Sequence, residues 1–130
     1  MIRAISFGYS KFLKDIIDID AYTGKDLNRG QRSIEHIKPK SHGGSNSLEN
    51  YLVVDRTLNS NRGNLDFDKW LAKFPEFIKN IQDYLDKVRG IKYKANNFDN
   101  HKYVKNVINT LNRESKGVAS FRGNKLDYFA

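Results

Sequence analysis

The middle of the sequence consists of two short apolar segments separated by a polar loop. Residues 33–37 and 51–54 are too short for a stable helix and carry aliphatic residues, so both are predicted to be strands. Pro39 ends the first segment, and residues 40–49 form a ten-residue polar stretch with a Gly-Gly pair. Such a loop is long enough to present polar groups to a ligand.

A short helix is predicted directly after the second strand. Asp55 is a suitable N-cap for residues 56–62, and Gly63 is a suitable residue to follow the last turn. Apart from Leu58 this helix has few apolar positions, and its composition is poor for an isolated helix. The polar side chains on it are therefore expected to have another role.

Helical periodicity flanks this central segment on both sides. The other predicted elements are a short helix after Ser10, a loop or hairpin over residues 21–32, a turn or short helix at Trp70 and Leu71, a helix over residues 75–90 and a helix over residues 99–117. The apolar stripes of the last two helices predict core or partner contacts and are candidate homodimer surfaces. Residues 118–130 are predicted to be a mobile tail.

Composition excludes several classes of protein. The 130 residues include no cysteine, which removes disulfide scaffolds, thiolate nucleophiles and cysteine-bound zinc. No apolar run approaches the roughly 20 residues that span a bilayer, and the N-terminus lacks the pattern of a signal peptide. One intracellular, cytoplasmic domain over residues 1–130 is expected. Its 23 Lys and Arg against 15 Asp and Glu give a net charge of +8, which suits a polyanionic partner.

The central segment resembles the ββα-metal core of HNH endonucleases. The resemblance covers residues 21–64, about a third of the chain, and is carried mainly by SIEHIKPKSHGGSNSLENYLVVDRTLNSNRGN at residues 33–64. It is close to the HNH domains of RNA-guided CRISPR nucleases, including Tyr22-Thr23-Gly24-Lys25 and Ser47-Leu48-Glu49-Asn50. The expected fold is α+β, with a core over residues 21–64 and a helical extension over residues 66–117.

The resemblance implies a role for four residues. Glu35 binds the metal, His36 is the general base, Asn50 is structural, and Asn59 completes the metal site. Asn50 follows His36 by 14 positions and Asn59 follows Asn50 by nine, as in the family pattern. Asn61 is the rival for the last role, but it points some 200° away from Asn59 on a helix, and the spacing favours Asn59.

Two departures from the family pattern stand out. Glu35 occupies the position where the CRISPR domains usually carry Asp, which affects the geometry and preference of the metal site. The expected metal is one Mg²⁺ ion, with Mn²⁺ as the alternative. Many HNH proteins brace this core with a zinc held by two pairs of cysteines. Without cysteine, the brace is expected to come from the packing of Tyr22 and the helices instead of a structural zinc.

The chemistry of these residue types suits phosphodiester hydrolysis. A hard cation held by oxygens of Glu35 and Asn59 can neutralise a phosphate and stabilise the departing oxygen. His36, with an ordinary pKa of about 6.5, can take a proton from water at neutral pH. Because neighbouring strand residues point to opposite faces, Glu35 and His36 are expected to approach one phosphate from opposite sides.

Basic residues of the central segment are expected to hold the DNA backbone, most simply that of duplex DNA. They are Arg32, Lys38, Lys40, Arg56 and Arg62. Arg62 could also stabilise developing charge, whereas His42 and His101 are assigned no role. One such site cuts one strand, so a double-strand break would need dimerisation, a second domain or two binding events. The alternative functions are a catalytically weak or inactive DNA-binding module and a metal-dependent RNase or nuclease toxin. Phage homing, restriction, packaging and repair all employ this core, so the biological role and a phage or viral origin stay open.

Overall fold

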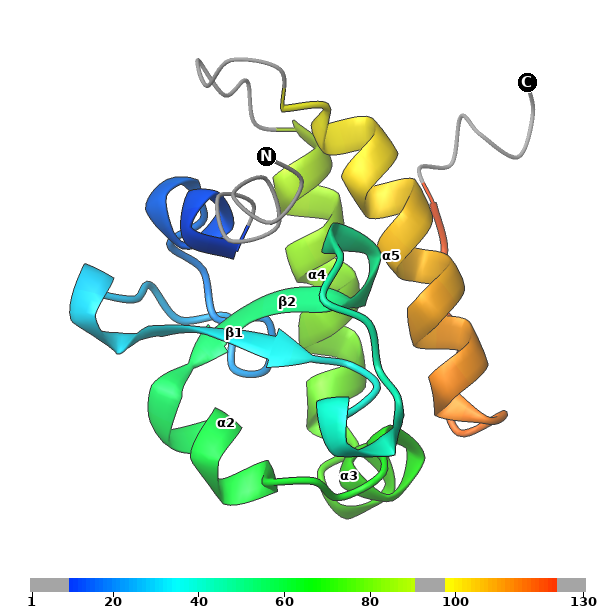
Figure 1. Cartoon of the computed structure of the whole chain (residues 1–130). Coiled ribbons are helices and arrows are strands. Elements are labelled where there is room, and N and C mark those ends of the chain that lie inside the picture. The colour runs from blue at the N-terminus through cyan, green and yellow to red at the C-terminus, as the bar shows by residue number, and fades with distance from the viewer. Residues whose placement is uncertain (1–9, 91–97, 124–130) are drawn as a thin grey trace.

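The computed structural model describes residues 10–90 and 98–123, and Figure 1 shows its elements. In chain order these are the 3₁₀ turn η1 (Arg29–Gln31), strand β1 (Arg32–His36), the 3₁₀ turns η2 (Lys40–His42) and η3 (Leu48–Asn50), strand β2 (Tyr51–Asp55), and helices α2 (Arg56–Arg62), α3 (Phe67–Lys73), α4 (Glu76–Gly90) and α5 (Asn100–Ser115). Residues 10–16 are also helical. The α+β prediction is confirmed, and the two strands and the helices lie within a few residues of their predicted positions.

Strands β1 and β2 form an antiparallel two-stranded sheet. Its register pairs Glu35 with Leu52 and His36 with Tyr51. Glu35 is buried whereas His36 is partly exposed, as the alternation of side chains along a strand requires. The side chains of the two residues therefore lie on opposite faces of the sheet.

Helix α2 is held against the sheet largely by polar contacts. The Asp55 carboxylate accepts hydrogen bonds from the backbone N–H groups of Thr57 and Leu58 at 2.8 and 3.2 Å, which is the expected N-cap. At its other end Gly63 has φ +57°, a conformation that favours glycine. Asn59 and Arg62 of this helix bind β1 and the residues that follow it. The polar composition of the helix is thereby explained.

Helices α4 and α5 pack beside one another and against the sheet (Figure 1). The Tyr103 hydroxyl donates to the Tyr51 carbonyl at 2.7 Å, and the Tyr84 hydroxyl accepts from the Val53 N–H at 3.2 Å. The two hydroxyls are 3.0 Å apart, so buried hydrogen bonds tie both helices to β2. Helix α5 also packs on η3, next to the start of β2.

The apolar stripes of α4 and α5 are buried in the core of the chain itself. Their large apolar side chains, among them Phe77, Ile81, Leu85, Val104 and Leu111, are buried in one cluster with residues of the sheet. Among the described residues, Val118 is the one large hydrophobic side chain that is exposed. The stripes therefore make the predicted core contacts, and their burial gives no support to the alternative that they form a homodimer surface.

The first part of the predicted mobile tail is packed against the helices. Phe121 is only 3% exposed, and its backbone N–H and carbonyl both bind the Asn112 amide, at 2.7 and 3.1 Å. The prediction of mobility is wrong for residues 118–123, and residues 124–130 lie outside the described part of the chain.

No helix among the described residues is long and apolar enough to cross a membrane.

Candidate active site

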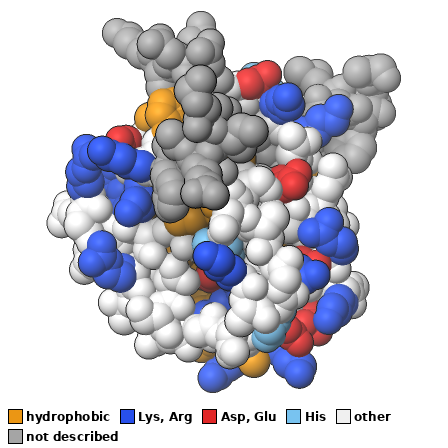
Figure 2. Space-filling view, in the orientation of Figure 1, with side chains coloured by type: hydrophobic (Ala, Val, Ile, Leu, Met, Phe, Trp, Pro, Cys, Tyr) orange, Lys and Arg blue, Asp and Glu red, His pale blue; other side chains and the backbone are white. Residues whose placement is uncertain are grey.

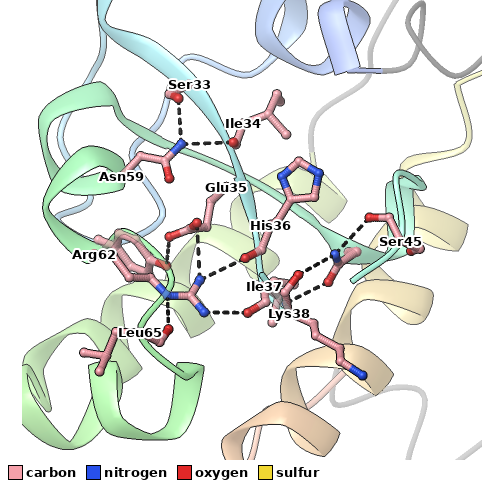
Figure 3. A network of polar contacts seen from close by, with 12 residues as sticks. Ser33, Ile34, Glu35, His36, Ile37, Lys38, Ser45, Asn59, Arg62 and Leu65 are labelled. Atoms are coloured by element: carbon pink, nitrogen blue, oxygen red, sulfur yellow. Dashed lines mark hydrogen bonds and ion pairs between the residues drawn. The ribbon is translucent and has the colours of Figure 1, made fainter. Parts of the chain in front are cut away.

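Glu35 is buried on the side of β1 that faces α2. The Tyr22 hydroxyl donates to Glu35 Oε2 at 2.6 Å, and Arg62 Nη1 lies 3.2 Å from Oε1 (Figure 3). Burial raises the pKa of Glu35, while Arg62 and the Tyr22 hydrogen bond favour the charged form and oppose that rise. Both oxygens of the candidate metal ligand therefore have a protein partner.

Arg62 is the centre of this polar network rather than a surface cation. Its side chain is fully buried, and the guanidinium donates to the carbonyls of His36, Ile37 and Leu65 at 2.9, 2.7 and 2.9 Å (Figure 3). It also stacks over the Phe67 ring, 5.3 Å from the centroid. The expectation that Arg62 holds the DNA backbone is wrong, because all of these contacts lie inside the protein.

His36 lies at the end of β1 with its ring on the opposite side from Glu35 (Figure 3). The ring meets the Tyr51 ring edge to face, with 5.1 Å between the centroids. Its Nε2 atom lies 2.9 Å from Oδ1 of Asn46, in the loop that joins the two strands. The imidazole is partly exposed and is thus within reach of a ligand.

Asn59 is anchored to β1 by its amide nitrogen. Nδ2 donates to the Ser33 hydroxyl at 2.7 Å and to the Ile34 carbonyl at 3.0 Å. In Figure 3 the amide oxygen is turned toward the Glu35 side of the strand. Asn61 is exposed, as the rotation between the two positions on α2 predicts.

Asn50 holds the long loop to the end of β1. It is 2% exposed, and its amide oxygen accepts from the Lys38 N–H at 2.9 Å while Nδ2 donates to the carbonyls of Lys38 and Ser45, both at 3.0 Å. The loop also passes so close to Lys38 that a Cβ on Gly44 would stand 1.9 Å from the Lys38 carbonyl oxygen. The structural role predicted for Asn50 agrees with these contacts.

Substituting Asn50 with alanine is expected to reduce both stability and activity. The change removes the partner of the partly buried N–H and carbonyl of Lys38, which costs about 1–3 kcal/mol. The loop that carries Asn46 loses its anchor as well. Urea denaturation and a nuclease assay of Asn50→Ala measure the two effects, with exposed Asn61→Ala as control. An Asn50→Ala variant as stable as the wild type would contradict this account.

The other predicted DNA-binding residues differ in their availability. Lys40 and Arg56 are exposed and Lys38 is partly exposed. Arg32 is partly buried, and it donates from Nε to the Leu27 carbonyl at 3.1 Å and from Nη1 to the Lys14 carbonyl at 2.8 Å. Figure 2 shows further lysine and arginine side chains spread over the face seen in Figure 1. His42 pairs with Asp66, 3.0 Å away.

Tyr22 provides part of the brace expected in place of zinc. It is fully buried, and its ring stacks on Phe77 with 4.9 Å between centroids and meets Trp70 edge to face at 5.8 Å. Its hydroxyl contact with Glu35 was not foreseen, because the two residues are 13 positions apart and no periodicity links them. Asn46 was also missed; its place in a polar loop was its one signal.

In a comparison with known protein families, the segment that carries this site matches one family model. Residues 20–65 match the model of a family described as HNH endonuclease. The matched span contains Tyr22, Glu35, His36, Asn59 and Arg62. No curated protein and no solved structure gave a significant match to the chain.

Proposed function

We propose that this chain, of which residues 20–65 match the HNH endonuclease family, hydrolyses DNA phosphodiester bonds with one divalent metal ion. The family match supports a nuclease of HNH type. The observation that carries the finer proposal is the arrangement at the end of β1, where a partly exposed histidine adjoins a carboxylate and an anchored amide on the other face. The metal, the DNA substrate and the residue roles are parts of this proposal.

Glu35 and Asn59 would hold the metal. They offer one carboxylate and one amide oxygen, and Mg²⁺ in proteins is usually bound through one or two carboxylates, with water and phosphate as the other ligands. Among the described residues, no group of three His, Cys, Asp or Glu that could hold a metal is found. Each Glu35 oxygen keeps a second lone pair beside its contact with Tyr22 or Arg62. The donor set therefore suits Mg²⁺ or Mn²⁺.

His36 would act as the general base. When bound, the metal supplies positive charge that stabilises the phosphate and the departing oxygen. His36 takes a proton from the attacking water, which requires an imidazole that is neutral and accessible. Arg62 fixes the His36 carbonyl, and the Tyr51 ring limits the orientation of the imidazole. Each site, with one metal ion and one general base, is proposed to nick one strand.

Lys40 and Arg56 are proposed to bind DNA phosphates. Replacing both with alanine is expected to weaken binding to unrelated duplexes about equally and to lower the slope of log K against log salt by about 2, since each phosphate contact contributes about 0.9. Titrations of a labelled duplex over a range of salt concentrations measure this slope. Lys79→Ala is the matched control, because Lys79 is exposed on α4 and lies 3.7 Å from Asp83. An unchanged slope in the double variant would exclude these two residues.

A cleavage assay on three substrates separates this function from its alternatives. Duplex DNA, single-stranded DNA and RNA of one sequence are incubated with the protein and Mg²⁺. Cleavage of duplex DNA is expected. Cleavage of RNA alone would replace the proposal with a ribonuclease, and binding without cleavage of any substrate would favour a DNA-binding module.

A further inference from the structure

The contact between His36 and Asn46 specifies which ring nitrogen carries the proton. Nε2 of His36 lies 2.9 Å from Oδ1 of Asn46. In this structure Oδ1 of Asn46 faces the ring, and because an amide oxygen can only accept a hydrogen bond, Nε2 is the donor in this arrangement. In the neutral imidazole the lone pair then resides on Nδ1. The nitrogen free to receive a proton is therefore Nδ1.

The loop that carries Asn46 is anchored at the residue before it. The buried Asn50 amide donates to the Ser45 carbonyl at 3.0 Å and binds both backbone groups of Lys38. Lys38 follows His36 by two positions, so the two partners of the Nε2 contact are held to one another through Asn50. On the other side, the Tyr51 ring packs against the imidazole.

We propose that Asn46 is a positioning residue for His36: it accepts the Nε2–H and so presents Nδ1 as the atom that takes the proton from the attacking water. The role in catalysis rests on the proposed function, whereas the tautomer does not. Asn46 touches neither substrate nor metal in this account and acts through the histidine. One proton moves from water to Nδ1 as the water oxygen bonds to phosphorus and the bond from phosphorus to the departing oxygen breaks, while the Nε2–H remains hydrogen-bonded to Asn46.

The tautomer can be read directly from ¹⁵N chemical shifts of the histidine rings, measured without metal or substrate at a pH where the rings are neutral. The chain has three histidines, and substitution of each one assigns its signals. His36 is expected to show a protonated Nε2 and a bare Nδ1. His42 is an internal contrast, because its Nδ1 faces the Asp66 carboxylate at 3.0 Å and is expected to carry the proton. His101 is exposed on α5, and its signals serve as the reference for a solvent-exposed ring.

Two variants of Asn46 test the inference. Asn46→Ala is expected to shift the His36 signals toward the mixture of the two neutral tautomers that is expected for an exposed ring such as that of His101. It is also expected to lower kcat about 3- to 10-fold with little change in KM. Asn46→Asp keeps an acceptor and is expected to retain the Nε2–H tautomer. Ser41→Ala, exposed in the same loop, is the matched control. Because Asn46 is also exposed, these substitutions are expected to leave the fold intact.

Each outcome supports or overturns the inference. A His36 ring with its proton on Nδ1 in the wild type, or an Asn46→Ala variant with unchanged tautomer and kcat, would overturn it. A tautomer that responds to Asn46 in a protein that cleaves no nucleic acid would instead refute the proposed function, and with it the catalytic half of the inference.

Discussion

Replacing Arg62 with methionine is expected to lower the free energy of unfolding by about 3–5 kcal/mol, which is the usual cost of removing one partner from a buried ion pair. Glu35 would remain buried at 3% exposure, keeping the hydrogen bond from the Tyr22 hydroxyl but losing the guanidinium charge beside it. The carbonyls of His36, Ile37 and Leu65 would also lose a donor. Urea denaturation at neutral pH measures the loss.

The loss should depend on pH in a defined direction. Without Arg62, the pKa of the buried Glu35 rises further above that of the unfolded chain, because the nearest opposing charge is gone. A raised pKa in the folded state favours folding with the carboxyl protonated, and this contribution is lost as pH increases above the unfolded value. The variant should therefore be destabilised more at pH 8 than at pH 5.

Two controls separate the ion pair from general effects of substitution. Arg56→Met changes an exposed arginine of the same helix and should alter stability by less than about 0.5 kcal/mol. The double variant Glu35→Gln/Arg62→Met should lose less stability than the sum of the two single variants, since no unpaired charge remains. Additive losses at all pH values would show that the two side chains are not coupled.

Replacing His36 with alanine is expected to lower kcat for DNA cleavage about 10²- to 10⁴-fold, the range that a general base contributes. The side chain is partly exposed and its contacts are with the Asn46 amide and the Tyr51 ring. The loss of stability should therefore be small, and DNA binding, which depends on charge, should persist. Single-turnover cleavage and gel-shift titrations measure the two properties separately.

His42→Ala provides the matched control for this experiment. His42 is an exposed histidine in the adjoining loop, and its contact is with Asp66 rather than with the residues of β1. Cleavage by this variant should remain near that of the wild type. If His36→Ala cleaved as fast as His42→Ala, another group would have to be the base.

The hairpin and α2 could be predicted from the sequence because their signals are local. Asp55 and Gly63 fix the ends of α2, and the apolar segments fix the strands. The sequence predicts the first strand at residues 33–37, whereas the strand covers Arg32–His36. Ile37 follows it as a buried residue whose N–H donates to the Asn50 carbonyl. That hydrogen bond joins segments 13 positions apart and leaves no local pattern.

The candidate site could be predicted in part from the resemblance to HNH endonucleases, which singled out Asn50 and Asn59 by their spacing from His36. In the structure Asn59 contacts β1 and Asn50 holds the loop. The burial of Arg62 could not be foreseen. An arginine beside Gly63 has the pattern of a solvated helix end, and only the tertiary fold gathers three carbonyls and Glu35 around it.

The apolar stripes of α4 and α5 show a second limit of sequence patterns. Helical spacing predicts that Phe77, Ile81 and Leu111 need a partner surface, and it says nothing about whether that surface belongs to the same chain. Tyr84 and Tyr103 bind β2 of the same chain through hydrogen bonds that no spacing rule contains. The choice between core and interface required the fold.

The most direct test of a metal-dependent, His36-based nuclease is nicking of supercoiled plasmid by the purified protein in EDTA, Mg²⁺ or Mn²⁺, with His36→Ala in parallel. Open circular DNA is expected to accumulate ahead of linear DNA in Mg²⁺ or Mn²⁺, with none formed in EDTA and little formed by His36→Ala. Cleavage that persists in EDTA, or equal cleavage by the variant, would contradict this account.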